Sequence, residues 1–444
     1  MDRSTGRARI SRFAGLLAVV LGAAFLAGSA AWAGPESESD KLKLVIILSR
    51  HGVRSPLSTD AALAGLASQP WPKWGMEPGI QTPHGNQLVA MMGDYYRARF
   101  IREGALTGDP AQDGPRVFIR ADNDQRTIET GRILGKALVP VGEPDVHALP
   151  AGTVDPLFRP YEAHVGNADP ALAAAAILGR MGADPKGLER AYSRQLEELK
   201  GVLYGPGGSP GPDSPFNQPT VVAPGKHHYL VDISGPFHAA LGATDALLLE
   251  YADDKPIQDV GWGRVDSKVM TDLLSLHELF FDLAARTRYP AQVGGSNLAS
   301  HIVDTLEQAA TGDPVPGALG PTDEKVVVLV GHDTNIANVG GLFDLNWCVA
   351  GTQLNPTLPG GALVIELWMR SGQPDSFYIQ ASYVAQTLDQ MREATPISLD
   401  SPPAVAPIFV PGSSGSDHDF SSPLPAFVRQ ARKVIDPSFI APEP

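Results

Sequence analysis

Short runs of consecutive apolar residues alternate along the chain with longer stretches in which apolar positions recur every three or four residues. The short runs are rich in Val and Ile and are typical of strands buried on both faces of a sheet. The longer stretches are typical of amphipathic helices. Predicted strands lie at residues 43–49, 116–120, 144–149, 324–330, 361–369 and 376–384, and predicted helices at 83–103, 124–138, 234–251 and 267–287. This alternation predicts an α/β fold with a mixed, largely parallel sheet flanked by helices.

The middle of the chain has a different pattern from its two ends. Between residues 151 and 265, helical pieces are separated by loops, and the Gly- and Pro-rich segment 205–215 predicts a surface loop. Strand-like runs return only beyond this region. We therefore expect one α/β catalytic domain formed by residues 34–150 and 266–444, with residues 151–265 inserted as a mostly helical cap domain.

The first 33 residues have the three parts of a secretory signal peptide. Four arginines precede an apolar run, which ends at the cleavage-site pattern Ala31-Trp32-Ala33. An uncleaved membrane anchor is the alternative, because about 20 apolar residues can span a bilayer. Since Gly and Ala dilute this run, we expect cleavage, a periplasmic or secreted protein, and no stable membrane anchor in the mature chain.

The amino-acid composition excludes some classes of molecule that the protein could bind. The 444 residues include 35 Lys and Arg against 49 Asp and Glu, which gives a formal net charge of -14. This balance excludes a globally basic surface for nucleic acid. The single cysteine, Cys348, permits no disulfide within the chain and no cysteine-based zinc site, and we expect it to be buried and inert. We expect a monomer that acts on a small molecule.

A polar loop follows the first predicted strand and contains Arg50, His51, Gly52 and Arg54. Planar guanidinium groups bind phosphate oxygens in pairs, and neutral imidazole is a nucleophile that forms covalent intermediates. Because the neighbouring positive charges disfavour imidazolium, we expect His51 to stay neutral into acid pH. Gly52 is expected to leave room for a close approach of the ligand. The loop therefore predicts phosphoryl transfer to His51.

Two further polar loops follow predicted strands, one containing His332 and Asp333 and the other Arg126. The carboxyl ends of parallel strands meet at one edge of an open α/β sheet, where ligands bind. There we expect His332 to donate to a phosphate oxygen and a protonated Asp333 to act as general acid toward the leaving group. Since the arginines supply the charge stabilisation, no metal or other cofactor is required. For any one of these loops alone, a solvated loop without chemistry is the alternative.

These motifs resemble those of the histidine acid phosphatases, and the chain is most similar to the bacterial periplasmic phytases and acid phosphatases among them. The resemblance extends from about Leu44 to the final helix. It rests on SRHGVRSP (49–56), ADNDQRT (121–127), DPLF (155–158), GWGR (261–264), LLSLH (273–277), GHDTNIANVGG (331–341) and QTLDQMREATPISL (386–399).

The resemblance implies that His51 is the nucleophile that forms a phosphohistidine and that Asp333 protonates the leaving alcohol. It also implies a set of side chains that bind the transferred phosphate and two others near the substrate pocket. The phosphate-binding set is Arg50, Arg54, Arg126 and His332, and the two others are Asp122 and His277. The implied activity is hydrolysis of phosphate monoesters at acid pH, with phytate (myo-inositol hexakisphosphate) as the substrate.

The sequence departs from the family pattern in features that bear on the substrate, so phosphate monoesters other than phytate are alternative substrates. Relatives usually carry several disulfides, and phytases often have a Thr-Lys pair where this chain has Leu57-Ser58. Gly52 and the sequence HDTN at 332–335 nevertheless favour the phytases over the glucose-1-phosphatases. A broad-specificity acid phosphatase or glucose-1-phosphatase with little phytate activity is the alternative, and a non-catalytic phosphate-binding protein is a further one.

Overall fold

Strand β1 (Lys41–Arg50) lies at the centre of an eight-stranded sheet in the computed structural model, which describes residues 40–57, 63, 65–416 and 419–441. The strand order is β10-β8-β7-β1-β6-β2-β3, with β9 paired to β8. The other strands of this sheet are β2 (Val117–Ala121), β3 (Val146–His147), β6 (Val326–Gly331), β7 (Ala362–Met369), β8 (Phe377–Ala385), β9 (Ala404–Pro407) and β10 (Ser422–Pro423). Each strand expected from the apolar runs is present, although β3 is short.

The parallel pairings are confined to one half of the sheet. Strand β1 pairs with β6, β6 with β2, and β2 with β3 in parallel. Strands β7, β8, β9 and β10 all pair antiparallel with their neighbours, so the sheet is mixed, as predicted. Arg50 lies opposite Gly331, and Ala121 lies opposite Val330. The carboxyl ends of β1, β6 and β2 therefore lie side by side at one edge.

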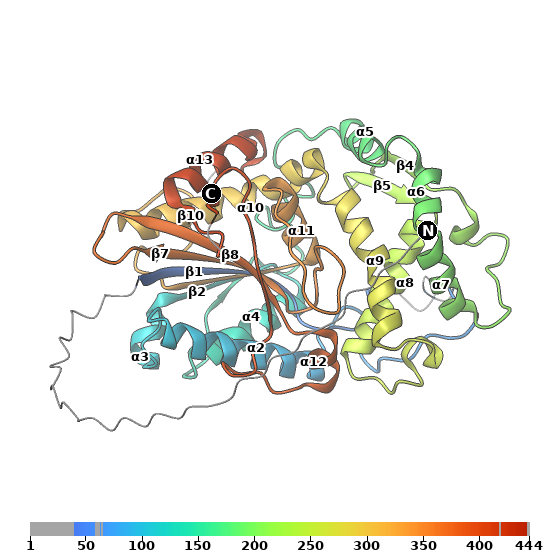
Figure 1. The fold of residues 1–444 in the computed structure, drawn as a ribbon, viewed down its shortest axis with the longest axis horizontal. Helices are drawn as coiled ribbons and strands as arrows, with labels where there is room; N and C mark the ends of the chain where they lie inside the picture. Colours follow the sequence, from blue (N-terminus) through green and yellow to red (C-terminus); the bar gives the residue numbers. More distant parts are fainter. Residues whose placement is uncertain (1–39, 58–62, 64, 417–418, 442–444) are drawn as a thin grey trace, which may run out of the picture. The chain divides into compact units, whose positions relative to one another are not determined.

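Helices cover both faces of the sheet (Figure 1). One face of the sheet carries α2 (Pro83–Arg102) and α4 (Gln125–Leu138). The other face carries α10 (Arg288–Thr311), α11 (Asp333–Leu342) and α13 (Leu424–Val434). There are also two short helices, α3 (Pro110–Asp113) and α12 (Leu388–Glu393). Alternate residues of β1 enter two cores, with Val45 and Ile47 on the α2 side and Leu44 and Ile46 on the α10 side. The side chain of Thr82 caps α2 by accepting a hydrogen bond from the N–H of Gly85.

A second group of helices lies beside the sheet layers (Figure 1). It consists of α5 (Pro170–Arg180), α6 (Pro185–Ala191), α7 (Ser193–Tyr204), α8 (Pro236–Ala252) and α9 (Ser267–Ala284), together with a hairpin of β4 (Val221–Pro224) and β5 (Val231–Ser234). This hairpin was not predicted, because its strands are only four residues long. Helix α9 packs on α7 and α8, although the predicted division placed it in the α/β part. The exact extent of a cap domain stays a prediction.

Cys348 is exposed, so the expectation of a buried thiol was wrong. It lies in an extended segment in which Trp347 and Val349 on either side are buried. Because side chains alternate along extended backbone, the residue between them points outward. The predicted signal peptide at 1–33 lies outside the described residues. Within the described part of the chain, no helix has the length and apolar character needed to cross a membrane.

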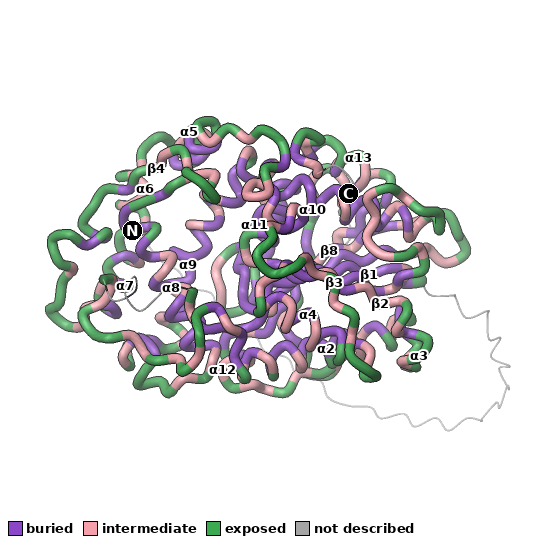
Figure 2. Tube along the Cα trace, turned by 180° about the vertical axis from the view of Figure 1, so that it is seen from behind, coloured by how far each residue is buried: buried purple, intermediate pink, exposed green. Residues whose placement is uncertain are grey.

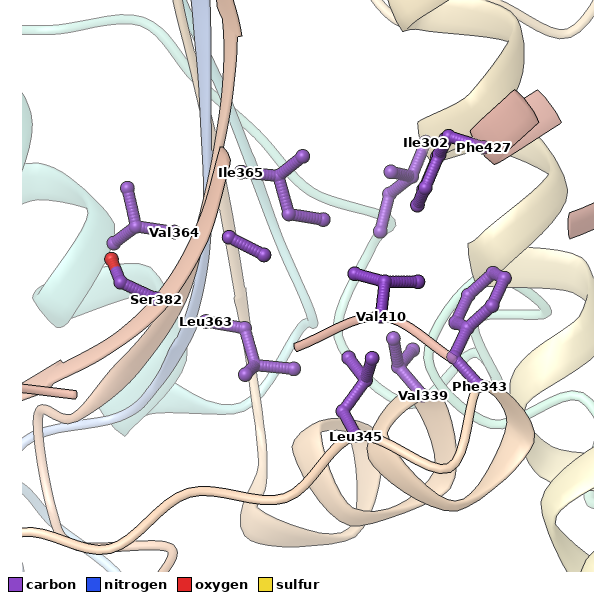
Figure 3. Close-up of a pocket in the computed structure, with 11 residues that line it drawn as sticks. Ile302, Val339, Phe343, Leu345, Leu363, Val364, Ile365, Ser382, Val410 and Phe427 are labelled. Carbon is purple, nitrogen blue, oxygen red and sulfur yellow. The ribbon is translucent and has the colours of Figure 1, made fainter. Parts of the chain in front are cut away.

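The central strands are buried along most of their length (Figure 2). A cavity of about 20 Å³ lies in the core beside β7, between α10, α11 and α13 (Figure 3). Apart from Ser382, its lining is apolar, and it includes Ile302, Val339, Phe343 and Leu363. These apolar side chains have no charge or hydrogen-bond donor that could bind a phosphate. The polar loops at the edge of the sheet are therefore the candidate site.

Candidate active site

Three polar loops meet where the parallel strands end. The N–H of His51, directly after β1, donates to the carbonyl of Gly331 at the end of β6, with an N···O distance of 3.1 Å. The N–H of Asp122, directly after β2, donates to Val330 at 3.0 Å. His332 follows β6 on the same edge. The register of the sheet thus brings together the loops that the sequence analysis singled out.

His51 is buried, with 1% of its surface exposed, and its ring has a defined tautomer. Its Nδ1 lies 2.8 Å from the carbonyl oxygen of Gly52. Because a carbonyl only accepts hydrogen bonds, Nδ1 carries the proton and Nε2 keeps a lone pair. Burial, and then the positive charges of Arg54, Arg50 and Arg126, hold the pKa of His51 well below its usual value. The neutral ring was expected from the arginines, and burial adds the larger cause.

Gly52 packs closely against α2. A Cβ at this position would lie 2.7 Å from Cγ2 of Val89 and 3.1 Å from the side chain of Gln81. The N–H of Gly52 donates to Oγ1 of Thr130 on α4 at 2.9 Å. Close packing is therefore one reason for a glycine here, and the expectation that it leaves room for a ligand stays a prediction.

Arg50 and Arg54 share one carboxylate, that of Asp245 on α8. Nη2 of Arg50 lies 3.1 Å from Oδ1, and Nη2 of Arg54 lies 3.2 Å from Oδ2. Arg50 is fully buried and also donates to the carbonyl of Thr357 at 2.6 Å. Asp245 was not predicted to belong to the site. The signal available was a lone acidic residue within the apolar stretch 239–249 of a helix.

Arg126 belongs to a second network of charges at the same edge. Its Nη2 lies 2.7 Å from Oδ2 of Asp124, which also accepts from Nη2 of Arg159 at 2.6 Å. Nε of Arg159 donates to Oδ2 of Asp122 at 2.8 Å. Arg159 directly follows the DPLF motif (155–158), but it was missed because no predicted strand precedes it. It is half-buried and holds both aspartates.

Asp122 is inaccessible to solvent and orients His332. Nε2 of His332 donates to its Oδ2 at 2.7 Å. The ring of His332 lies 5.7 Å from that of His51, centroid to centroid, at 70°. Burial raises the pKa of Asp122, but the bonds to His332 and Arg159 outweigh it and lower the value overall. The structure therefore places Asp122 between His332 and Arg159, and its predicted place near the substrate stays a prediction.

Asp333 is the first residue of α11 and pairs with Arg50. Its Oδ2 lies 3.0 Å from Nη2 of Arg50, and its Oδ1 accepts from the N–H of Thr334 at 2.8 Å. Burial raises its pKa, but the charges of Arg50 and His277 outweigh burial and lower the value to about 2. The free protein therefore carries Asp333 as a carboxylate, which differs from the expectation of a protonated side chain.

His277 lies beneath the site, with 1% of its surface exposed. Its Nε2 is 3.9 Å from Oδ1 of Asp245, and its Nδ1 is 3.6 Å from Oε1 of Glu278. Burial lowers its pKa, but Glu278 and Asp245 outweigh this and raise the value overall. The structure therefore places His277 beside the carboxylates of Asp245 and Glu278, and its predicted place near the substrate stays a prediction.

Among the residues that the structure describes, two sets of side chains have the ligand types that hold metal ions. They are Asp122, Asp124 and His332, and Asp245, His277 and Asp333, with ligand atoms within 4.8 Å of one another in each set. Their carboxylates are already paired with guanidinium groups. Arginines therefore occupy the positions where a cation would sit, and both sets fit an anion site better than a metal site.

Comparisons with known proteins point to one family. Residues 41–200 and 230–384 match the model of the histidine phosphatase superfamily, branch 2. Phytase AppA of Escherichia coli K12 is 35% identical over 386 residues, which cover 84% of this chain and 87% of the relative. A glucose-1-phosphatase of Providencia rettgeri is 28% identical over 87% of this chain and 91% of the relative. The structure of Hafnia alvei phytase in complex with myo-inositol hexakis sulphate matches with a TM-score of 0.81 and 31% identity over 92% of this chain and all of the other.

Proposed function

The chain belongs to branch 2 of the histidine phosphatase superfamily, and from this we propose that it hydrolyses phosphate monoesters through a phosphohistidine at His51. The proposal rests on the burial and the protonation state of His51. The ring is buried and neutral, its Nδ1 proton is held by the Gly52 carbonyl, and its Nε2 is free. A neutral imidazole among guanidinium groups is the nucleophile that phosphoryl transfer needs.

In the first step, Nε2 of His51 attacks phosphorus while the bond from phosphorus to the ester oxygen breaks. Arg50, Arg54 and Arg126 bind the equatorial oxygens, and their charge stabilises the phosphoryl group in transfer. His332, oriented by Asp122, completes the set. Asp333 gives a proton to the ester oxygen, so the alcohol leaves neutral.

In the second step, water attacks the phosphorus of the phosphohistidine. The Asp333 carboxylate takes a proton from this water, the bond from phosphorus to Nε2 breaks, and inorganic phosphate leaves. His51 returns to its neutral form. Asp333 thus serves as acid and then as base, which requires that it gain and lose one proton per turnover.

The proposed substrate is phytate. Support comes from the 35% identity to a relative named phytase AppA and from the structural likeness to a phytase bound to an inositol hexakis sulphate. The alternative is a broad acid phosphatase or glucose-1-phosphatase, which the 28% identity to a glucose-1-phosphatase keeps in view. Leu57, at a position where phytases often have Thr, favours the alternative. Comparing kcat/KM for phytate, glucose 1-phosphate and nitrophenyl phosphate, with mapping of the inositol phosphate products, decides between them.

The phosphohistidine is tested by rapid quenching. Wild-type protein mixed with a ³²P-labelled monoester should carry an acid-labile, base-stable label on His51, and His51→Ala should carry none and lose activity. A chiral thiophosphate ester should be hydrolysed with retention, since two in-line displacements occur. Inversion, or full activity of His51→Ala, would show that water attacks directly. Phosphate binding without turnover would instead support the non-catalytic alternative.

We propose further that the mature protein is a periplasmic or secreted monomer. The basic and apolar pattern of residues 1–33 supports export. Helices α5 to α9 are proposed to form the cap that sets substrate breadth, since α8 supplies Asp245 to the two arginines. Mass spectrometry of the exported chain, with sedimentation of the purified protein, tests the cleavage site and the monomer together.

A further inference from the structure

Arg159 takes no part in the steps of the proposed mechanism, on which this inference rests, but it binds both carboxylates that hold phosphate-binding side chains. Its Nε lies 2.8 Å from Oδ2 of Asp122, and its Nη2 lies 2.6 Å from Oδ2 of Asp124. One planar guanidinium group thus bridges two carboxylates through two different nitrogens. A bridge of this kind fixes the orientation of both carboxylates and the distance between them.

The two oxygens that Arg159 binds are the same oxygens that hold the phosphate-binding side chains. Oδ2 of Asp122 also accepts from Nε2 of His332, at 2.7 Å. Oδ2 of Asp124 also accepts from Nη2 of Arg126, at 2.7 Å. Each phosphate-binding side chain is therefore separated from the same guanidinium group by a single carboxylate oxygen.

Arg126 depends on this arrangement because it has few other partners. Its side chain is 12% exposed, and its one hydrogen bond among the described residues is the bond to Asp124. Its Nε is buried and has no hydrogen-bond partner among those residues. A carboxylate bound to Arg126 alone would compete with phosphate for this guanidinium group. Because Arg159 shares the carboxylate and adds a positive charge beside Arg126, it favours phosphate binding there.

The backbone that carries Arg159 is fixed at the reacting edge of the sheet. The side chain of Asp155 pairs with Arg120 on β2, and the N–H of Arg159 donates to the carbonyl of Asp155 at 2.7 Å. Nδ2 of Asn335 on α11 donates to the carbonyl of Phe158 at 2.8 Å. A residue that orients others must itself be held in place. These bonds hold the loop at a set position relative to β2 and α11.

We propose that Arg159 is a positioning residue that keeps Arg126 and His332 directed toward the transferred phosphate. It acts through the carboxylates of Asp124 and Asp122 and does not itself contact the phosphate. Without it, Asp124 pairs with Arg126 alone, and Asp122 loses a donor that fixes it beside His332. Both changes weaken the binding of the phosphoryl group in the transition state and therefore lower kcat/KM.

Two other roles for Arg159 predict different results. If its charge alone mattered, Arg159→Lys would restore activity, although a lysine is a point charge and lacks the planar fork that bridges two carboxylates. If Arg159 supported the fold in general, its loss would lower activity by the same factor whatever stands at positions 122 and 124. A positioning role through these two carboxylates predicts instead that the loss nearly disappears once both are neutral.

The experiment measures kcat/KM for nitrophenyl phosphate at pH 5 in the exported protein and its variants. We expect Arg159→Gln to lower kcat/KM about thirtyfold and Arg159→Lys about tenfold, because charged hydrogen bonds are lost. In the Asp122→Asn/Asp124→Asn background, Arg159→Gln should change kcat/KM by less than about threefold. The control Arg180→Gln removes the same charge from an exposed pair with Asp282 and should match wild type.

An equal loss in both backgrounds, wild-type activity of Arg159→Gln or full activity of Arg159→Lys would overturn the proposal. If the variants of Asp122 do not fold, Asp124→Asn decides alone. In that background the effect of Arg159→Gln should shrink at least about threefold, and an undiminished effect would overturn the proposal. The acid-labile label on His51 is measured in wild type in parallel. Its absence would refute the phosphohistidine itself, whereas its presence together with equal losses would refute only the role of Arg159.

Discussion

Oδ1 of Asp245 lies 3.1 Å from Nη2 of Arg50, joining helix α8 to the end of strand β1 across 195 residues of sequence. The other carboxylate oxygen pairs with Arg54 at 3.2 Å. In the free protein, Asp245 therefore occupies the two guanidinium groups that are proposed to bind the phosphate. An arriving phosphate must compete with this carboxylate for the same donors.

Replacing Asp245 by Asn should strengthen the binding of inorganic phosphate at pH 7. The substitution keeps the side chain's size but removes the charge that competes for Arg50. We expect a product inhibition constant about tenfold lower, since a charged hydrogen bond contributes about 1.5 kcal/mol. The fall in kcat/KM between pH 5 and pH 7 should also become shallower. Inhibition by phosphate across this range measures both effects.

The control for Asp245→Asn is Asp272→Asn on the outer face of α9, which changes the net charge equally but pairs with Lys268 and Arg194 instead. It should leave phosphate inhibition at the wild-type value. An unchanged inhibition constant in Asp245→Asn would mean that its carboxylate does not compete with phosphate.

The hydrogen bond between Asp122 and His332 should contribute measurably to kcat/KM. Asp122→Asn is expected to lower kcat/KM about ten- to a hundredfold, because a charged hydrogen bond that orients the ring is lost. Since both residues act through one bond, the double variant with His332→Ala should be little worse than His332→Ala alone. Additive losses in this double-mutant cycle would show that Asp122 acts separately from His332.

Gly52 should tolerate no side chain because of its neighbours on α2. Gly52→Ala brings a Cβ to 2.7 Å from Val89 and should lower the free energy of unfolding by about 1–3 kcal/mol. The added substitution Val89→Ala should relieve part of the strain added at position 52. Gly201→Ala on α7 is the control, because no atom lies within 4 Å of its added Cβ, and it should be neutral or stabilising. Urea unfolding compares the four proteins.

The ionisation of Asp333 should make the free energy of unfolding depend on pH over a defined acid range. Its pKa of about 2 lies below the unfolded value of about 3.9, so the ionised form stabilises the fold fully above pH 4. That contribution, about 2 kcal/mol, is lost as pH falls through about 2. Asp333→Asn should therefore be less stable than wild type at pH 6, and the difference should shrink between pH 4 and pH 2. Denaturation at several pH values checks this, and a constant difference would contradict it.

The elements at the edge of the sheet were predictable because their signals are local. Continuous apolar runs fixed β1 and β6, and the polar residues that end them placed His51 and His332 at the edge of the sheet. The β4–β5 hairpin was missed because four-residue strands carry too little pattern. Cys348 was misjudged because its exposure depends on the direction of one extended segment.

The partners of the site residues could not be predicted from local patterns in the sequence. Asp245 and Arg159 are ordinary charged residues in the sequence, and only packing shows that they hold Arg50 and Asp122. The ionised state of Asp333 likewise depends on the arginine beside it, which the sequence separates by 283 positions.

By itself, the sequence determined the family, the mixed α/β sheet and the residues that form the reacting edge, because strand periodicity and strand ends are encoded in neighbouring residues. The tertiary structure alone decided which carboxylate meets each guanidinium, how closely Gly52 packs against α2 and where His277 lies. These depend on contacts between segments far apart in the chain, whose geometry arises only when the helices pack against the sheet.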